Sequence, residues 1–241
     1  MMRIFIQLLL LSTFFACSSE KMEPLPPVIP EVKNEMSISI LSLGDSYTKG
    51  TSVVASQKFP VQLKDQLDAD TFSIEDGSPW VIANTGWRTD DLKTAIQNAA
   101  FLQDTFSLVT LCIGVNNQYL NGDVNVYKAD FENLLKTAIQ KAGNRQHRVM
   151  VVSIPDWAFT PYGQNFPEDP VNISAEIDSF NQANKFIADQ YGVHYIDVTG
   201  ISRQGLVRPE LVAYDGLHPS ELQYTEWVQL MLPVAMEALS H

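Results

Sequence analysis

Five short apolar segments alternate with amphipathic segments along most of this chain, and this alternation restricts the possible folds more than any other feature. The apolar segments span residues 38–43, 80–83, 108–113, 149–154 and 193–198. Apolar residues at helical spacing lie between and after them, over residues 58–67, from Thr89 onward, and over 130–142, 174–191 and 222–239. Strands that are apolar throughout are buried on both faces, which is typical of a parallel sheet covered by helices. We therefore expect an α/β protein: a three-layer α/β/α sandwich with a five-stranded parallel sheet.

The size and charge of the chain narrow its possible partners. Its 241 residues, 45% of them hydrophobic, suffice for one domain with a sizeable core. The formal net charge is -12, and no cluster of Lys and Arg residues provides the basic face that a phosphate backbone requires. We therefore expect no nucleic-acid partner.

The first residues have the pattern of an export signal. An apolar run over residues 4–15 is too short to span a bilayer and ends at Ala16-Cys17. A small residue before a cysteine at this place resembles the lipobox of bacterial lipoproteins, which implies that Cys17 is lipidated. We expect residues 1–17 to be a signal peptide and residues 18–35, which are rich in proline, to be a tether. The catalytic domain would then span residues 36–241, in a protein exported and lipid-anchored to the periplasmic or outer-membrane face of the bacterial envelope.

The cysteines indicate neither a disulfide nor a metal site. The chain has two, Cys17 at the end of the apolar leader and Cys112 inside an expected core strand. No CxxC motif or Cys/His cluster has the spacing of metal ligands. We expect no metal and no cofactor, and a buried Cys112 that packs as a small hydrophobic residue.

The segments that follow the expected strands contain the residues of an acyl-transfer site. Ligands of open parallel sheets bind at the carboxyl ends of the strands. Ser46, in Gly44-Asp45-Ser46, offers a hydroxyl nucleophile, and His218 offers a base. Asp215, three residues before His218, can orient the imidazole. The oxyanion donors would be the Ser46 amide, the Gly86 amide and the Asn116 side chain. Each segment alone is also compatible with an ordinary turn or loop.

From residue 37 to its end the chain resembles the SGNH, or GDSL-type, serine hydrolase family. Gly44-Asp45-Ser46 matches the first block of the family, and Asp215-Gly216-Leu217-His218 matches the last. Gly114-Val115-Asn116-Asn117 corresponds to the third block, in which Asn117 replaces an acid. The second block maps to Gly86, although its usual continuation is replaced by Trp87-Arg88-Thr89. The resemblance implies the flavodoxin-like SGNH hydrolase fold and the site roles just given.

A competing serine-hydrolase design fits less well. The α/β-hydrolases carry Gly-x-Ser-x-Gly around the nucleophile, and Thr48 occupies the last glycine position here.

Aromatic residues in the loops after the strands are candidates for a substrate pocket: Trp87, Trp157 and Tyr162.

These residues predict a carboxylic ester hydrolase that acts on short-chain acyl esters, with acetylated carbohydrates as a candidate substrate. The partner would be a small-molecule or carbohydrate ester, and the membrane would be contacted by the lipid anchor only. Three alternatives use the same fold: an O-acyltransferase, a lysophospholipase- or thioesterase-like enzyme, and a non-catalytic surface glycan-binding protein.

Overall fold

A computed structural model describes residues 37–70, 72–75, 77–100 and 104–241. The expected signal peptide, the lipidated Cys17 and the tether lie outside these ranges. Within them, no helix is both long enough and apolar enough to cross a membrane.

The central element is one parallel sheet of five strands. These are β2 (Ile40–Gly44), β4 (Trp80–Ala83), β5 (Leu108–Cys112), β6 (Val149–Val152) and β7 (His194–Ile196), in the spatial order β4-β2-β5-β6-β7. This is the doubly wound order of flavodoxin-like folds, in which the chain changes direction beside the first strand. The expected five-stranded parallel sheet is therefore confirmed.

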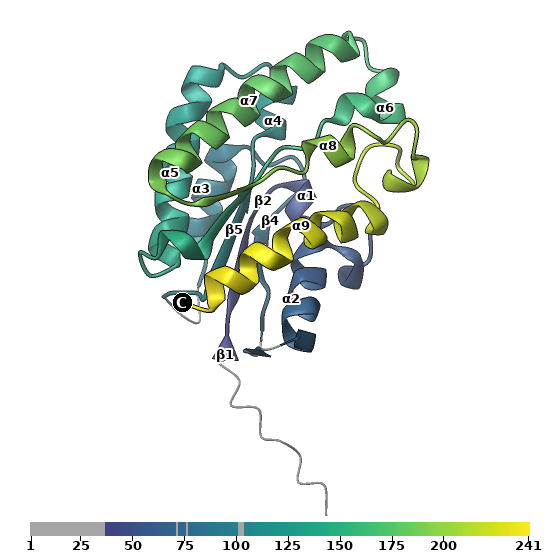
Figure 1. Cartoon of the computed structure of the whole chain (residues 1–241). Helices are drawn as coiled ribbons and strands as arrows, with labels where there is room; N and C mark the ends of the chain where they lie inside the picture. The colour runs from purple at the N-terminus through teal and green to yellow at the C-terminus, as the bar shows by residue number, and fades with distance from the viewer. Residues whose placement is uncertain (1–36, 71, 76, 101–103) are drawn as a thin grey trace, which may run out of the picture. The chain divides into compact units, whose positions relative to one another are not determined.

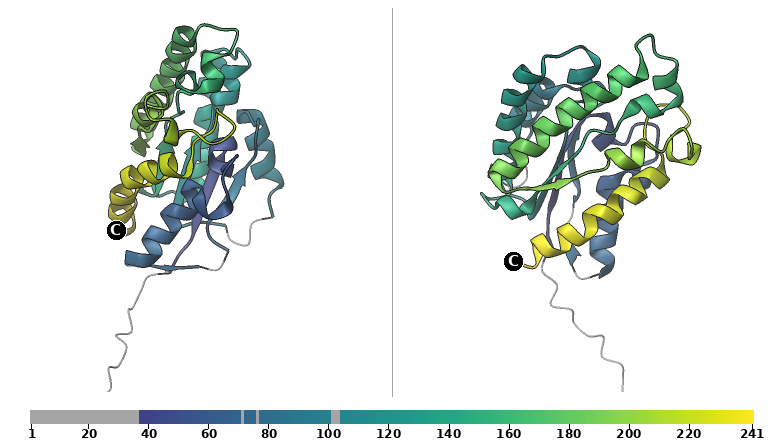
Figure 2. Two further views of the ribbon diagram at one scale, coloured as in Figure 1. Left: turned by 90° about the vertical axis from the view of Figure 1, so that its right-hand side faces the viewer. Right: turned by 45° about the horizontal axis from the view of Figure 1, so that its top comes forward.

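Helices cover both faces of the sheet. On one side lie α3 (Thr89–Asn98), α5 (Val124–Lys141) and α7 (Pro170–Tyr191), and on the other lie α2 (Phe59–Asp70) and α9 (Glu221–Leu239) (Figure 1). The two views in Figure 2 show the same three layers. Shorter helical elements at the ends of the strands are α1 (Ser46–Lys49), α4 (Val115–Tyr119), α6 (Pro161–Gln164), α8 (Thr199–Ser202), η1 (Ala55–Gln57), η2 (Gln146–Arg148), η3 (Trp157–Phe159) and η4 (Pro209–Leu211).

Several element boundaries differ from the sequence expectation. The first expected strand is divided at Ser39: β1 (Ser37–Ile38) pairs with β3 (Ser73–Ile74) in a separate two-stranded parallel sheet, and β2 begins only at Ile40. The Ser39 carbonyl instead accepts hydrogen bonds from the amides of Ser107 and Leu108. The Ser39 hydroxyl also accepts a hydrogen bond from the Ser107 amide, at 3.3 Å. Side-chain bonds to the backbone compete with regular pairing and are hard to infer from periodicity.

Two helices begin earlier than their apolar periodicity indicates. α5 begins at Val124 because Asp123 caps it, accepting a hydrogen bond from the Asn125 amide at 2.7 Å. Similarly, α7 begins at Pro170 after the capping residue Asp169. Aspartate at the cap and proline in the first turn favour helix initiation, so capping residues, rather than apolar spacing, determine these helix ends.

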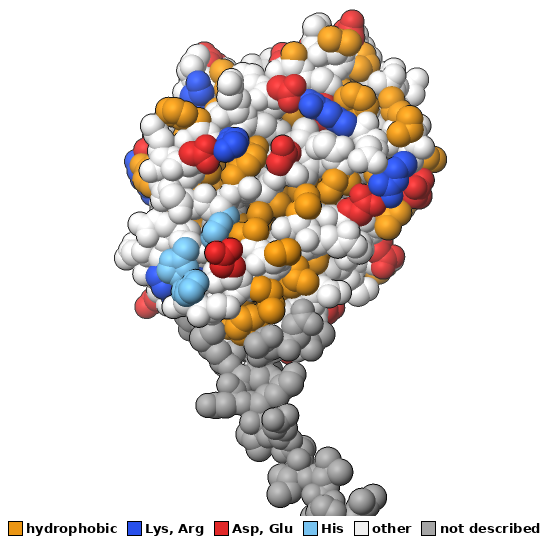
Figure 3. Space-filling model, in the orientation of Figure 1, with side chains coloured by type: hydrophobic (Ala, Val, Ile, Leu, Met, Phe, Trp, Pro, Cys, Tyr) orange, Lys and Arg blue, Asp and Glu red, His pale blue; other side chains and the backbone are white. Residues whose placement is uncertain are grey.

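The core lies on both faces of β2 and β5, whose residues are all buried. Cys112 is a buried free thiol in β5. On the α9 side, the aromatic rings of Phe59, Tyr224 and Trp227 pack together. Each large apolar side chain buried in this way stabilises the fold by about 1.5–3 kcal/mol. The surface has charges of both signs, and hydrophobic side chains are also visible over α9 (Figure 3).

Candidate active site

The strand-to-helix turn after β2 positions Ser46. Gly44 ends the strand, where a Cβ atom would collide with the Thr48 side chain and the Cys112 carbonyl, so only glycine allows this close approach. Asp45 caps α1 by accepting a hydrogen bond from the Tyr47 amide at 3.0 Å. Ser46 is therefore the first residue of α1, and it is only 4% exposed.

Asp45 itself is buried, and this changes its titration. Burial raises the pKa of Asp45 to about 7, although backbone hydrogen bonds, that from Tyr47 foremost, act to lower it. Its Oδ1 accepts the bond that caps α1, whereas Oδ2 has no hydrogen-bond partner in the described part of the chain. Asp45 therefore serves the geometry of the turn rather than a charge in the pocket.

The last block folds into a tight turn in which one carboxylate holds the imidazole. The Nδ1 atom of His218 lies 2.6 Å from Oδ2 of Asp215. The Leu217 and His218 amides donate to Oδ1 of Asp215 at 3.0 Å. Because Nδ1 bonds the carboxylate, Nε2 is left to face a proton donor.

Asp215 receives a further hydrogen bond that the sequence did not indicate. The Ser52 hydroxyl donates to Oδ2 of Asp215 at 2.6 Å, the same oxygen that holds His218. Burial acts to raise the pKa of Asp215, but the hydrogen bonds from Ser52, His218 and the two amides outweigh it and lower the pKa to about 2. Asp215 is thus a carboxylate across the physiological pH range.

The residues after α1 also bond to the loop that follows β4. Lys49 Nζ donates to Asn84 Oδ1 at 2.7 Å, and the hydroxyls of Thr51 and Thr85 are 2.7 Å apart. Together with Ser52, these side chains connect the turn that carries Ser46 to two other loops that line or flank the pocket. Because the connected residues lie far apart in the chain, no local sequence pattern could have revealed them.

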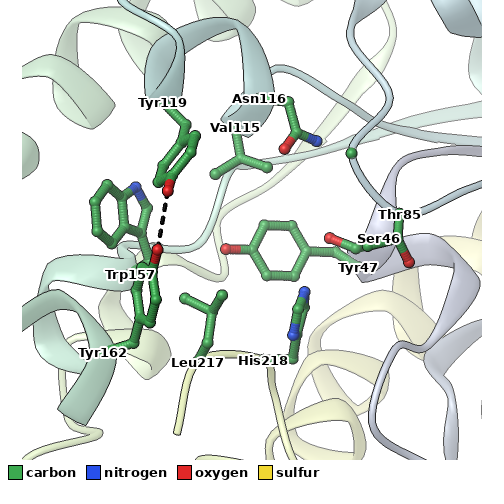
Figure 4. Close-up of a pocket in the computed structure, with 11 residues that line it drawn as sticks. Ser46, Tyr47, Thr85, Val115, Asn116, Tyr119, Trp157, Tyr162, Leu217 and His218 are labelled. Atoms are coloured by element: carbon green, nitrogen blue, oxygen red, sulfur yellow. Dashed lines mark hydrogen bonds between the residues drawn. The ribbon is translucent and has the colours of Figure 1, made fainter. Parts of the chain in front are cut away.

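One pocket of about 200 Å³ lies at the carboxyl ends of the strands. Both Ser46 and His218 contribute to its lining (Figure 4). No hydrogen bond joins the Ser46 hydroxyl to His218 within the described residues, and such bonds are often long before substrate binds. The lining consists of Ser46, Tyr47, Thr85, Gly86, Val115, Asn116, Tyr119, Trp157, Tyr162, Leu217 and His218.

The two expected oxyanion donors outside α1 also line this pocket. Gly86 has a φ angle of +83°, a left-handed conformation that favours glycine, and a Cβ atom there would meet only open space. The Asn116 side chain donates one of its two amide hydrogens to the Trp87 carbonyl at 2.9 Å. The other amide hydrogen is available to a ligand.

Asn117, which departs from the usual acid, has a structural task. Its Oδ1 accepts a hydrogen bond from the Thr89 amide at 3.2 Å, and its Nδ2 donates to the Thr89 hydroxyl at 3.0 Å. These two bonds attach α4, which follows β5, to the first residue of α3. The loop that carries Gly86 is thereby held beside Asn116.

The three aromatic residues expected in the pocket are placed differently. Trp157 and Tyr162 line it, whereas Trp87 does not and packs half-buried against the core. Arg88, its neighbour, forms a surface ion pair with Asp90 at 2.7 Å. Pocket residues that the sequence did not indicate are Tyr47, Thr85, Val115, Tyr119 and Leu217.

Within the described ranges, no three His, Cys, Asp or Glu side chains lie close enough together to hold a metal ion. The polar groups of the pocket are instead a hydroxyl, an imidazole and amide donors, which suit acyl transfer.

Solved structures share this fold. A family 3 carbohydrate esterase from Clostridium thermocellum has a TM-score of 0.65 and 20% identity, covering 85% of this chain and 98% of that one. A lipase/acylhydrolase from Enterococcus faecalis has a TM-score of 0.60 and 20% identity, with 81% and 94% covered. Axe2, an acetylxylan esterase from Geobacillus stearothermophilus, has a TM-score of 0.58 and 17% identity, with 87% and 97% covered.

Sequence comparison adds the family. No curated protein matches the sequence significantly. The model of the GDSL-like lipase/acylhydrolase family matches residues 42–225, which include the turn of Ser46, the loop of Asn116 and the turn of His218. The chain therefore belongs to the GDSL-like lipase/acylhydrolase family and is a carboxylic ester hydrolase.

Proposed function

We propose that the protein is a serine esterase for short-chain acyl esters, with Ser46 as nucleophile, His218 as general base and Asp215 as the group that orients it. One observation carries the proposal: Ser46 and His218 line the same pocket, and Asp215 holds His218 Nδ1 at 2.6 Å. A nucleophile, a base and an orienting acid in this arrangement are what acyl transfer to a hydroxyl requires.

Acylation begins when Ser46 Oγ attacks the ester carbonyl carbon while its proton passes to His218 Nε2. The carbonyl π electrons move to oxygen, and the resulting oxyanion is stabilised by the Ser46 amide, the Gly86 amide and the free amide hydrogen of Asn116. When the carbonyl re-forms, the bond to the alcohol oxygen breaks. The leaving oxygen takes the proton from His218, and the acyl group remains on Ser46.

Deacylation repeats these steps with water. His218 removes a proton from a water molecule whose oxygen attacks the acyl carbon. The tetrahedral oxyanion collapses, the carboxylic acid leaves, and His218 returns the proton to Ser46. Throughout, ionised Asp215 stabilises the imidazolium form of His218 without itself taking the proton.

The size of the pocket favours small acyl groups. Pockets for drug-sized ligands are typically about 300–1,000 Å³, whereas this one is about 200 Å³. Acetylated carbohydrates are the natural substrates that we favour, because two of the similar structures are a carbohydrate esterase and an acetylxylan esterase.

The test is hydrolysis of p-nitrophenyl esters from acetyl to decanoyl by the purified protein and its Ser46→Ala variant. We expect activity on the shortest esters and a loss of several orders of magnitude in kcat in the variant. Near-normal turnover by Ser46→Ala would refute the assignment of the nucleophile.

The other activities on this fold predict different results. An acyltransferase would form a new ester when a competing alcohol or sugar is added, at the expense of free acid. A lysophospholipase or thioesterase would prefer long acyl chains or thioesters. A glycan-binding protein would bind acetylated polysaccharide with no turnover.

We further propose that the protein is exported and lipid-anchored through Cys17. The proposal is supported by the apolar run that ends at Ala16-Cys17 and by the proline-rich segment behind it. In a bacterial host, metabolic labelling with a fatty acid should label the wild type and not Cys17→Ser. Equal labelling of both proteins would contradict the anchor.

A further inference from the structure

The pocket has a polar end and an aromatic end. Ser46 and His218 lie at one end, and Tyr119, Trp157 and Tyr162 lie at the other (Figure 4). Between them the lining is formed by Tyr47, Val115 and Leu217, which are mainly apolar. A substrate whose carbonyl reaches Ser46 therefore extends a neighbouring apolar group toward the aromatic end.

Two tyrosines close this end. Tyr119 of α4 and Tyr162 of α6 come from separate segments, and their hydroxyl oxygens are 2.9 Å apart, within hydrogen-bond distance. Tyr119 is 37% exposed and Tyr162 is 38% exposed, and both line the pocket. We refer to Tyr119 and Tyr162 as the end wall.

The end wall rests on a fixed aromatic base. Trp157 is 2% exposed, and its indole nitrogen donates to Gln118 Oε1 at 2.9 Å. The ring of Phe166 lies 5.4 Å from that of Tyr119 and 5.8 Å from that of Tyr162, between ring centroids. Aromatic pairs at such distances attract one another, so the rings are held in place by packing as well as by the hydroxyl bond.

A second contact ties the end wall to the reacting end. The Tyr162 amide donates to the Gly216 carbonyl at 2.9 Å. Gly216 lies between Asp215 and His218 in the tight turn that holds the imidazole. This bond fixes the Tyr162 backbone relative to the turn that carries His218, as a length limit requires.

The volume favours a short acyl group. The pocket of about 200 Å³ is smaller than the roughly 300–1,000 Å³ typical of sites for drug-sized ligands. A short chain such as butanoyl therefore suits it better than octanoyl.

We propose that the end wall determines the maximum acyl length, so that the substrates are esters of unbranched acids from acetyl to about butanoyl. This inference rests on the proposed esterase function and names the acyl class that the site accepts. Tyr119 and Tyr162 are specificity-determining residues. Truncating either ring opens the pocket to solvent along the path of the acyl chain.

The test compares acyl series on the full chain purified in detergent. The p-nitrophenyl acetyl, butanoyl, hexanoyl and octanoyl esters are assayed with wild type, Tyr119→Ala, Tyr162→Ala and the control Phe186→Ala, which removes a 61% exposed ring from α7 outside the pocket. We expect the octanoyl-to-acetyl ratio of kcat/KM to rise about tenfold or more in both tyrosine variants. A ratio unchanged in both, as in the control, overturns the proposal.

Two further series refine the result. In the double variant Tyr119→Phe/Tyr162→Phe the rings remain but their hydroxyl bond is lost. We expect the octanoyl-to-acetyl ratio of kcat/KM to rise about two- to fivefold. An unchanged ratio would show that the hydroxyl bond does not contribute to the length limit. A series of acetate esters with lengthening alcohols tests the orientation. If the alanine variants alter preference among alcohols and not among acyl groups, the end wall faces the alcohol and the proposal is wrong.

A binding measurement separates this inference from the proposed function. On the Ser46→Ala background, calorimetry with butanoate and octanoate needs no turnover. With the end wall intact, we expect butanoate to bind more tightly than octanoate. When Tyr162→Ala is added, we expect the affinity for octanoate to rise about tenfold relative to that for butanoate. If the wild type hydrolyses no ester, the proposed esterase function fails, but the binding measurement still tests the end wall. Equal affinities for butanoate and octanoate, with and without Tyr162→Ala, overturn the end-wall proposal.

Discussion

The hydroxyl of Ser52 offers a sensitive test of how the site is organised. Ser52 does not line the pocket, yet it donates to the same Asp215 oxygen that holds His218. Asp215 accepts four hydrogen bonds, one from Ser52, two from backbone amides and one from the imidazole. Removing the Ser52 hydroxyl therefore perturbs the orienting carboxylate without contact to substrate.

The expected magnitude follows from the bond and its exposure. A hydrogen bond to a charged acceptor contributes about 1.5–3 kcal/mol. The Asp215 side chain is 26% exposed, so water can replace part of the lost bond. The net loss should therefore be about 1 kcal/mol, which lowers kcat roughly fivefold. Because Ser52 is absent from the pocket, KM should change less than about twofold.

The experiment pairs kinetics with a direct view of the imidazole. Ser52→Ala is assayed on p-nitrophenyl acetate, and the low-field proton resonance of His218 Nδ1 is recorded by NMR. Ser52 has a φ angle of +69°, so Ser52→Gly removes the hydroxyl in a residue that favours this backbone conformation. Equal losses in the two variants identify the hydroxyl, rather than backbone strain, as the cause.

A control removes an exposed hydroxyl that does not line the pocket. Thr94 donates within α3 to the Asp90 carbonyl, and Thr94→Ala should leave kcat and the resonance unchanged. Wild-type kcat and an unshifted proton in Ser52→Ala would refute the reasoning. A rise in KM with kcat preserved would do the same, because it would place Ser52 in substrate binding.

Three further predictions concern neighbouring positions. Asn116→Ala should lower kcat by about a hundred- to a thousandfold through loss of an oxyanion donor, and parallel losses in kcat and kcat/KM would check this. Asn117→Ala removes both bonds to Thr89 and should destabilise the fold by about 1–3 kcal/mol in urea unfolding; unchanged stability would contradict it. The pKa of Asp45 is about 7 in the folded state and 3.8 in an unfolded chain. Between these two pH values the folded state keeps the Asp45 proton while the unfolded state loses it, so the folded state loses stability as the pH rises from 3.8 to about 7. Asp45→Asn should therefore gain about 3 kcal/mol relative to wild type between about pH 5 and about pH 8 in urea unfolding, and a constant difference would disprove the assignment.

The layered architecture was predictable because it depends on local patterns. The strands β2, β5 and β6 are fully buried runs such as Leu108–Cys112, whereas the edge strands β4 and β7 are only partly buried. The sheet follows once each run is recognised. The boundaries were less predictable where a cap outweighed apolar spacing, as at Asp123, or where Ser39 interrupted a strand. Capping residues are visible in sequence, and greater weight on them would have placed the start of α5 correctly.

The positions of the site residues were predictable for a related reason. Parallel strands end at one edge of the sheet, so Ser46, Gly86 and Asn116 come close once each follows its own strand. Trp87 shows where this reasoning stops. It follows the same strand as Gly86, but its ring packs against the core instead of lining the pocket.

The sequence by itself determined the α/β class, the five strands and the blocks that carry Ser46 and His218, because neighbouring residues set periodicity, turns and strand ends. Only the tertiary structure decided that Ser52 bonds Asp215, 163 positions away, and that Tyr119 meets Tyr162. Such contacts depend on how loops from different elements pack. No property of either partner's local sequence encodes that packing, so these residues became visible only in the folded chain.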